Sequence, residues 1–165
     1  KRQNIYNMNN FLTIVLFAFL IINCSKKKES KDEYLPILLD MNNKEVSLDN
    51  YKENVLILNL WATWCKPCIA EFESLEKSKS NYLDKKVKIV AISNENHDKI
   101  QEFIKRREID LEFLKLNADL NYFGAFSLPT TIVFDKEGKE SFRIASGIDF
   151  ASQNFVEKIL DLEKL

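Results

Sequence analysis

Two cysteines separated by two residues, Cys65 and Cys68, are the residues whose type and spacing point most clearly to chemistry. They stand in the run W-C-K-P-C, where an apolar stretch that predicts a buried strand ends and a predicted helix begins. The free N–H groups and the dipole of a helix N-terminus stabilise an anion, so this position favours a thiolate at Cys65 over a thiol. The spacing places Cys68 one turn into the helix, where it can attack a disulfide formed on Cys65. The pattern therefore predicts thiol–disulfide exchange, and Pro67 suits the first helical turn because it needs no N–H partner there.

Three other uses of the pair find less support in the rest of the sequence. A purely structural disulfide gains little from closing so short a loop. A tetrahedral zinc site needs a second Cys-x-x-Cys or paired histidines, and the chain has one histidine. Haem attachment needs a histidine directly after the second cysteine, where Ile69 stands. The single histidine, His97, lies in the polar stretch S-N-E-N-H-D-K and is interpreted as a solvated loop residue, so no metal site is expected.

The elements that must position the pair follow the pattern of an α/β domain. Two continuous apolar runs, 55–61 and 87–92, are typical of strands buried on both faces of a sheet. Apolar residues recur at helical spacing between them, which predicts a βαβ unit with parallel strands and a right-handed crossover. The apolar residues of that helix are Ile69, Phe72, Leu75 and Tyr82.

Downstream, the pattern predicts a mixed sheet that is closed by a hairpin and a last helix. A helix is expected over 98–108, a short strand over 111–116, and two antiparallel strands over 130–135 and 139–144 around the turn K-E-G. Asp149 is expected to cap the last helix. The apolar face of that helix is predicted to comprise Phe150, Phe155, Ile159 and Leu160. The predicted fold is a mixed α/β sandwich without internal repeats or a second domain.

Length and charge limit the classes of function. The chain has 165 residues, enough for one ordinary domain and an appendage. Apolar residues make up 45% and charged residues 30%, which is a globular composition. Lys and Arg total 24 against 25 Asp and Glu, a net charge of −1. This balance does not favour a basic binding surface, so no nucleic-acid partner is expected.

The N-terminal part of the chain has the pattern of an export signal. Residues 11–22 contain one polar residue, Thr13, and are fewer than the roughly 20 residues of a membrane-spanning helix. They fit the apolar region of a signal peptide with Lys1 and Arg2 before it, and a buried core helix is the alternative. The run I-I-N-C resembles the lipobox of bacterial lipoproteins, which makes Cys24 the expected lipidation site. An uncleaved anchor and a free thiol at Cys24 are the alternatives.

The expected organisation follows from this interpretation. Residues 1–23 are predicted to be a lipoprotein-type signal peptide, 24–33 the lipidated cysteine and a polar tether, and 34–165 the folded domain. Acyl chains on Cys24 would hold the protein stably on a membrane. The expected location is therefore the cell envelope, facing the periplasm. Ser25, where an aspartate would favour inner-membrane retention in the lipoproteins that the chain resembles, favours the outer membrane.

Two separate motifs carry a family resemblance. The run L-N-L-W-A-T-W-C-K-P-C-I-A-E-F, with L-P-T-T-I-V-F-D-K-E-G-K about 60 residues later, resembles thioredoxin-fold proteins, and specifically the membrane-tethered TlpA/ResA-type thiol–disulfide oxidoreductases. The resemblance implies a thioredoxin-like three-layer sandwich. It also implies that Cys65 is the solvent-facing, attacking thiolate and Cys68 the resolving cysteine, and that Pro129 is a cis-proline opposite them. The residues expected to contact substrate are Trp64, Lys66, Pro67, Leu128 and Pro129.

Glu71 is the third residue to which the resemblance gives a catalytic role. It matches the acidic residue of the Cys-x-x-Cys-x-x-Glu pattern and is expected to assist proton transfer, because three residues along a helix bring it near Cys68. A solvated helix glutamate is the alternative. Asn59 stands where thioredoxin has a buried aspartate, which leaves Glu71 as the favoured proton acceptor.

The expected function is reduction of disulfides in exported proteins, with apocytochrome c as one candidate substrate. Exchange between sulfurs needs no organic cofactor, and a membrane thiol donor is the expected source of electrons. The protein is expected to be a monomer. The opposite direction, oxidation, stays open, because related Cys-x-x-Cys proteins differ widely in reduction potential. A thiol peroxidase-like antioxidant and a non-catalytic binding module are the alternatives.

Overall fold

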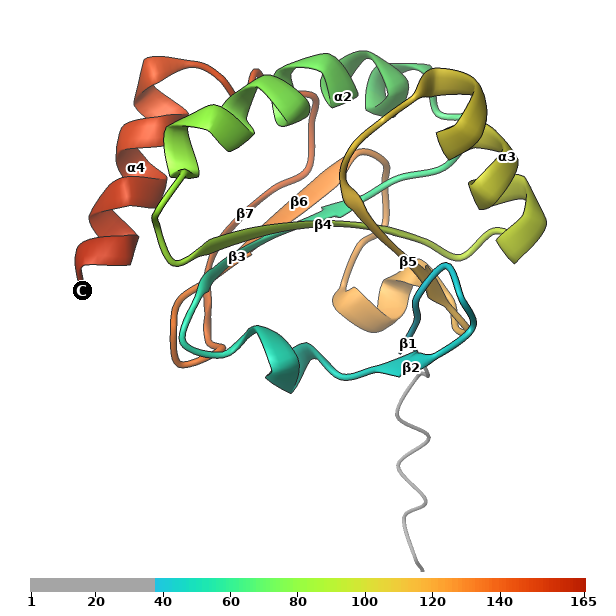
Figure 1. The fold of residues 1–165 in the computed structure, drawn as a ribbon, viewed down its shortest axis with the longest axis horizontal. Coiled ribbons are helices and arrows are strands. Elements are labelled where there is room, and N and C mark those ends of the chain that lie inside the picture. Colours follow the sequence, from blue (N-terminus) through green and yellow to red (C-terminus); the bar gives the residue numbers. More distant parts are fainter. Residues whose placement is uncertain (1–37) are drawn as a thin grey trace, which may run out of the picture. The chain divides into compact units, whose positions relative to one another are not determined.

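A seven-stranded mixed sheet is the centre of the described part of the chain, residues 38–165 of a computed structural model (Figure 1). The strand order is β2-β1-β5-β4-β3-β6-β7. The signal peptide, Cys24 and the tether predicted over 1–33 lie outside the described residues. The strands are β1 (Leu38–Leu39), β2 (Glu45–Val46), β3 (Val55–Leu60), β4 (Val87–Ser93), β5 (Glu112–Leu116), β6 (Thr130–Phe134) and β7 (Glu140–Ile144).

The middle of the sheet is parallel, as the continuous apolar runs predicted. Strand β4 pairs in parallel with β3 on one side and with β5 on the other. All six residues of β3 are buried, which explains why its sequence shows no alternation of apolar and polar residues. Helices α2 (Lys66–Ser78) and α3 (His97–Arg107) form the crossovers. Strand β6 pairs antiparallel with β3 and with β7, and the predicted turn before β7 has Gly138 at φ +80°.

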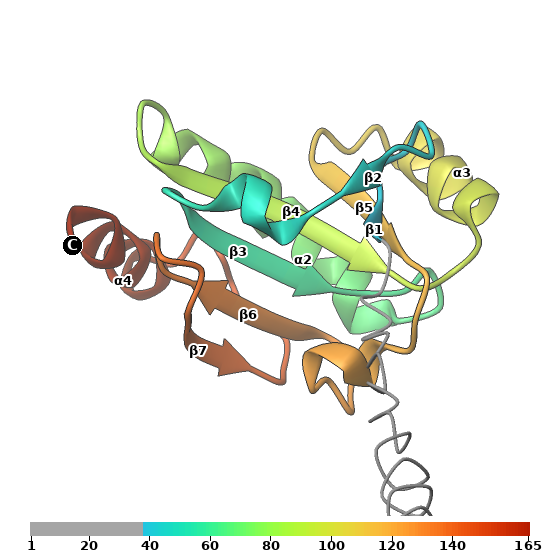
Figure 2. The same ribbon diagram turned by 90° about the horizontal axis from the view of Figure 1, so that it is seen from below.

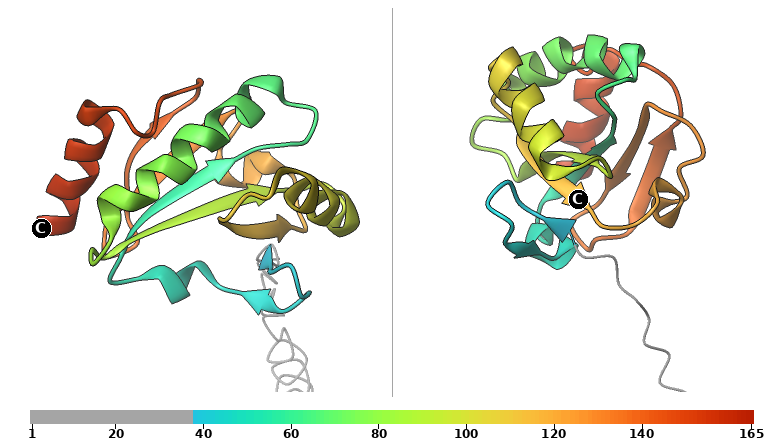
Figure 3. Two further views of the ribbon diagram at one scale, coloured as in Figure 1. Left: turned by 45° about the horizontal axis from the view of Figure 1, so that its top comes forward. Right: turned by 90° about the vertical axis from the view of Figure 1, so that its right-hand side faces the viewer.

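The two faces of the sheet are covered by different elements. Helices α2, α3 and α4 (Gln153–Lys164) lie together on one face, as Figures 1 and 3 show. The short 3₁₀ helices η1 (Leu48–Tyr51) and η3 (Leu120–Phe123) lie on the other, in front of the strands in Figure 2. A further 3₁₀ helix, η2 (Lys79–Tyr82), follows α2. The predicted thioredoxin-like sandwich of a mixed sheet flanked by helices is confirmed.

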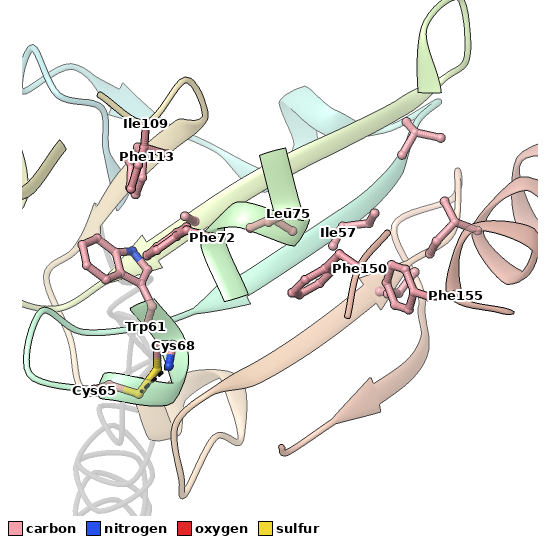
Figure 4. Close-up of a cluster of buried hydrophobic side chains, with 14 of the residues drawn as sticks. Ile57, Trp61, Cys65, Cys68, Phe72, Leu75, Ile109, Phe113, Phe150 and Phe155 are labelled. Atoms are coloured by element: carbon pink, nitrogen blue, oxygen red, sulfur yellow. Dashed lines mark hydrogen bonds between the residues drawn. A yellow bond between two sulfur atoms is a disulfide. The ribbon is translucent and has the colours of Figure 1, made fainter. Parts of the chain in front are cut away.

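An aromatic cluster joins the sheet to the helices near the end of β3. Trp61 is fully buried, and its ring centroid lies 5.0 Å from that of Phe72, 4.7 Å from that of Phe103 and 5.5 Å from that of Phe113. Figure 4 shows Trp61 in one cluster with Phe72 and the Cys65–Cys68 disulfide. Because aromatic packing of this kind is rigid, the loop that begins at Trp61 starts from a fixed point.

Three local predictions were wrong. Tyr82 lies in η2 rather than in the helix of Phe72, although it is buried as expected. Asp149 does not cap α4, which begins at Gln153 after Ser152, because the Asp149 carboxylate accepts the N–H of Ala151 in a tight turn instead. His97 is the first residue of α3, only 15% of its side chain is exposed, and its Nε2 is buried without a hydrogen-bond partner.

Within residues 38–165, no helix has both the length and the apolar character needed to cross a membrane.

Candidate active site

Cys65 and Cys68 are joined in a disulfide at the N-terminus of α2, with Cα atoms 5.3 Å apart (Figure 4). Cys65 is the N-cap residue of α2, and its Sγ accepts the backbone N–H of Cys68 at 3.3 Å. When the bond is reduced, the same N–H group and the helix dipole are placed to stabilise a Cys65 thiolate. Pro67 occupies the first helical turn, as predicted. The structure therefore places the two sulfurs as the sequence analysis expected.

The exposure of the sulfur-bearing residues differs from the expectation. The resemblance implied a solvent-facing Cys65, but in the disulfide form Cys65 is only 4% exposed and Cys68 is fully buried. The reason is local, because the Cys65 sulfur turns toward Cys68 and both residues belong to the apolar cluster that contains Trp61 and Phe72. Cys68 is thus the more deeply buried of the two residues.

Glu71 lies one turn beyond Cys68 on α2 and is buried, with 5% of its surface exposed. Its Oε1 accepts the backbone N–H of Ile148 at 2.6 Å, and its Oε2 has no partner. Burial raises the pKa of Glu71 from 4.5 to about 7, against smaller opposing contributions from the Ile148 N–H and the Asn59 side chain. The alternative of a solvated helix glutamate is wrong, and the carboxyl is poised to take up or release a proton near neutral pH.

Asn59 on β3 completes a buried polar group with Glu71. Its Nδ2 donates to Thr131 Oγ1 at 3.2 Å, on the strand next to it, and its Oδ1 is buried without a partner. The Asn59 side chain lies within hydrogen-bonding reach of the Glu71 carboxyl. The contact with Asn59 lowers the pKa of Glu71, which is the effect of an amide N–H directed at the carboxylate, but burial outweighs it and raises the pKa. Burial therefore favours the protonated form of Glu71, whose Oε2 has no hydrogen-bond partner.

The cis peptide bond predicted before Pro129 is present between Leu128 and Pro129. Strand β6 begins at the next residue, Thr130, which pairs with Leu60 at the end of β3. Since Cys65 follows Leu60 after one short loop, the cis-proline and the disulfide lie at the same end of the sheet. Pro129 itself is buried and Leu128 is partly buried, so any substrate contact of Pro129 is limited in area.

The residues around the disulfide that were expected to contact substrate are exposed. Trp64 is 69% exposed, and Lys66 and Pro67 are also on the surface. The sequence analysis missed Phe126, which is 90% exposed and stands two residues before Leu128. An aromatic residue beside a predicted cis-proline loop was the available signal. Trp64 and Phe126 thus give the loops that flank the disulfide an apolar surface.

The sequence analysis also missed Glu95, which contacts the loop before Cys65. Its carboxylate accepts hydrogen bonds from the backbone N–H and the hydroxyl of Thr63. The polar stretch around Glu95 gives no indication of this contact, because the contact depends on how β4 places the loop that follows it. Residues 38–165 contain no group of three or more side chains suited to bind a metal ion.

Two known proteins are similar to this chain in sequence. The thiol–disulfide oxidoreductase ResA of Bacillus thuringiensis subsp. konkukian is 32% identical over 108 residues, which cover 62% of this chain and 61% of that protein. The chain thus matches about three fifths of that relative's length. ResA of Bacillus subtilis is 27% identical over 150 residues, covering 84% of this chain and 83% of that protein.

A solved structure and a family model agree with these relatives. The crystal structure described as a putative thiol:disulfide interchange protein DsbE from Chlorobium tepidum superimposes with a TM-score of 0.68 at 19% identity, over 77% of this chain and 92% of that one. The model of the AhpC/TSA family matches residues 28–140. This range includes the cysteine pair, Glu71 and the cis-proline, and it is more than half of the sequence. The expected resemblance to thioredoxin-fold proteins is confirmed, and the chain belongs to the AhpC/TSA family.

Proposed function

We propose that this protein is an extracytoplasmic thiol–disulfide oxidoreductase that reduces disulfides in exported proteins. The observation that carries the proposal is the cysteine pair at the N-terminus of α2, with Cys65 as the N-cap residue and Cys68 fully buried in the first helical turn. The names of the ResA relatives support the same activity. Exchange between sulfurs requires no cofactor beyond the pair itself.

In the proposed reaction the Cys65 thiolate attacks one sulfur of a substrate disulfide, and the other substrate sulfur leaves as a thiolate. The product is a mixed disulfide between Cys65 and the substrate. Cys68 then attacks the Cys65 sulfur, which releases the second substrate thiolate and closes the disulfide seen in the structure. The substrate gains two electrons and the pair loses two, so a thiol donor must reduce the pair before the next cycle.

Glu71 is the proposed proton acceptor of the second step. Cys68 is fully buried, so its thiol needs a nearby base to become a nucleophilic thiolate. A carboxyl with a pKa of about 7 is well matched to this transfer at neutral pH. The proton that leaves Cys68 is then held by the buried Glu71 carboxyl, whose Oε2 has no other partner.

The finer parts of the proposal concern location and partners. The lipobox-like run before Cys24 supports a lipid anchor that holds the domain at a membrane surface facing the periplasm, with the outer membrane favoured by Ser25. A membrane thiol donor is the proposed source of electrons for the pair. Exposed Trp64 and Phe126 suit an unfolded or extended protein substrate, and apocytochrome c is one candidate of this kind.

The test is to trap the mixed disulfide. In the full chain with Cys24 retained, the Cys68→Ser variant should accumulate a covalent complex with an exported protein, and Cys65→Ser, which keeps both other cysteines, should accumulate none. Mass spectrometry of the trapped complex identifies the substrate. A Cys65→Ser variant that retains full function in cells would favour a binding module, and rapid peroxide consumption by the reduced protein would favour a peroxidase. Either result, or the absence of any trapped species, contradicts the proposal.

A further inference from the structure

Glu95 is a partly buried carboxylate that the exchange reaction described above does not use. It lies in the loop between β4 and α3, and only 9% of its side chain is exposed. Its Oε2 accepts the Thr63 N–H at 2.5 Å, and its Oε1 accepts the Thr63 hydroxyl at 2.9 Å and the Lys99 ammonium at 2.6 Å. Burial alone would raise the pKa of Glu95, but the bonds from Lys99 and Thr63 outweigh it and lower the pKa. Glu95 is therefore an anion that binds two separate parts of the molecule.

Thr63 belongs to the loop that carries the attacking sulfur. The loop leaves β3 at Trp61, whose N–H continues the hydrogen bonding to β4, and it ends with the Cys65 N–H bonded to the Ala62 carbonyl at 3.0 Å. The next side chain, Trp64, is 69% exposed and therefore adds little packing. The Glu95 carboxylate, which bonds both Thr63 and Lys99, is thus a direct side-chain link between this loop and α3.

The end of the loop determines where the Cys65 sulfur points. Cys65 is the N-cap residue of α2 with φ −83° and ψ 93°, and its Sγ accepts the Cys68 N–H. Rotation of the two peptide groups between Thr63 and Cys65 would move the sulfur away from that N–H. A displacement on the order of 1 Å at a reacting atom can lower a rate by up to about a hundredfold.

We propose that Glu95 is a positioning residue for Cys65, which acts through Thr63 by fixing the loop that directs the sulfur. The inference rests on the proposed function only in taking Cys65 as the attacking thiol. The residues that hold Cys65 in position would then lie in α3 and in the loop before it, and not in α2, the helix that carries the cysteine pair.

A carboxylate close to a thiol can also act through its charge, and the two effects have opposite signs. Removing a negative charge favours the Cys65 thiolate and raises its reactivity at neutral pH. Releasing the loop weakens the contact between Cys65 Sγ and the Cys68 N–H, which lowers that reactivity. The sign of the change therefore separates positioning from charge.

The experiment measures the rate at which iodoacetamide alkylates Cys65 in the reduced full chain carrying Cys24→Ser, with the modified residue identified by mass spectrometry. Glu95→Ala removes both bonds to Thr63, whereas Glu95→Gln removes the charge and keeps an oxygen for the Thr63 N–H. Glu73→Ala is the matched control, because Glu73 bonds Lys77 four residues along at 2.6 Å, the same spacing and distance as in the Glu95–Lys99 pair. Glu73 lies on the exposed surface of α2.

Glu95→Ala should slow alkylation by about tenfold, within the range that loss of alignment produces. Glu95→Gln should recover most of the rate, and Glu73→Ala should match the parent protein. Faster alkylation in both Glu95 variants would mean that Glu95 acts through its charge, and equal rates in all variants would mean that the loop needs no anchor. Both results overturn the proposal.

A second variant covers the case in which Glu95→Ala is too unstable to measure. Thr63→Val keeps the shape of the side chain and the N–H bond to Glu95, and removes only the hydroxyl bond. It should slow alkylation less than Glu95→Ala but in the same direction, and an unchanged or faster rate contradicts the proposal. Because alkylation needs no substrate, either failure leaves the trapping of a mixed disulfide by Cys68→Ser as an independent test of the function.

Discussion

The Glu71→Gln variant should abolish the pH dependence of stability that this buried carboxyl imposes. Glutamine has nearly the same shape as glutamic acid, and its oxygen can accept the Ile148 N–H. It therefore keeps the hydrogen bond that Glu71 makes in the structure and cannot ionise. The comparison of the two proteins isolates the cost of placing a carboxylate at this position.

The magnitude follows from the difference between the folded and unfolded pKa values. The pKa of Glu71 is about 7 in the folded protein against 4.5 for an ordinary glutamate, a difference that corresponds to about 3 kcal/mol at most. Because the folded state binds the proton more tightly, its stabilisation is complete below pH 4.5. The stabilisation decreases as pH rises and is lost once pH passes about 7. The wild type should lose stability over that interval, and Glu71→Gln should lose none from this source.

The assay is urea unfolding of the disulfide form of both proteins at several pH values between about 4.5 and 8, followed by far-ultraviolet circular dichroism. The free energy of unfolding of Glu71→Gln minus that of the wild type should rise across this range by up to about 3 kcal/mol. Glu73→Gln is the control, because it removes an exposed carboxylate from the same helix. A difference between Glu71→Gln and the wild type that stays flat with pH would refute the raised pKa, and with it the proposed proton acceptor.

Three further predictions concern other parts of the site and fold. Phe126→Ser should raise KM for a disulfide-bonded apolar peptide and leave the rate with a small disulfide unchanged, and Leu83→Ser, which replaces another exposed apolar side chain distant in the sequence, should change neither. Thr131→Val removes the oxygen that Asn59 Nδ2 bonds and should lower the free energy of unfolding by about 1–3 kcal/mol, measured by urea titration. Gly138→Ala places a side chain at φ +80° and should destabilise the protein by about 1 kcal/mol, whereas Lys139→Ala beside it should have little effect.

The predictable parts of the structure are those in which the local pattern and the tertiary structure agree. The parallel strands on either side of α2 were predicted because strands buried on both faces are continuously apolar. The cysteine pair was placed at the start of α2 because the change from strand to helix is visible in the residues around Pro67.

The wrong and missing predictions all depend on tertiary contacts. Asp149 is of a residue type that often caps helices, but its carboxylate bonds a nearer N–H group and α4 starts later. His97 sits in a polar stretch, yet it begins α3 and is largely covered. Glu95 gives no local sign of its role, because its partner Thr63 lies 32 residues earlier in the chain. The sequence around Glu71 does not show that this residue is buried, because the segment that covers it lies around Ile148, far along the chain.

The chain has two tryptophans, and their fluorescence can report on two different events. They stand three residues apart, but Trp61 is fully buried near the cysteine pair and Trp64 is mostly exposed to water. A disulfide quenches nearby indole fluorescence more strongly than thiols do, so reduction of the pair should increase the fluorescence intensity of Trp61. Emission from Trp64 should shift to shorter wavelength when an apolar partner covers it. Redox state and partner binding can thus be followed separately in one unlabelled sample, by intensity for the first and by colour for the second.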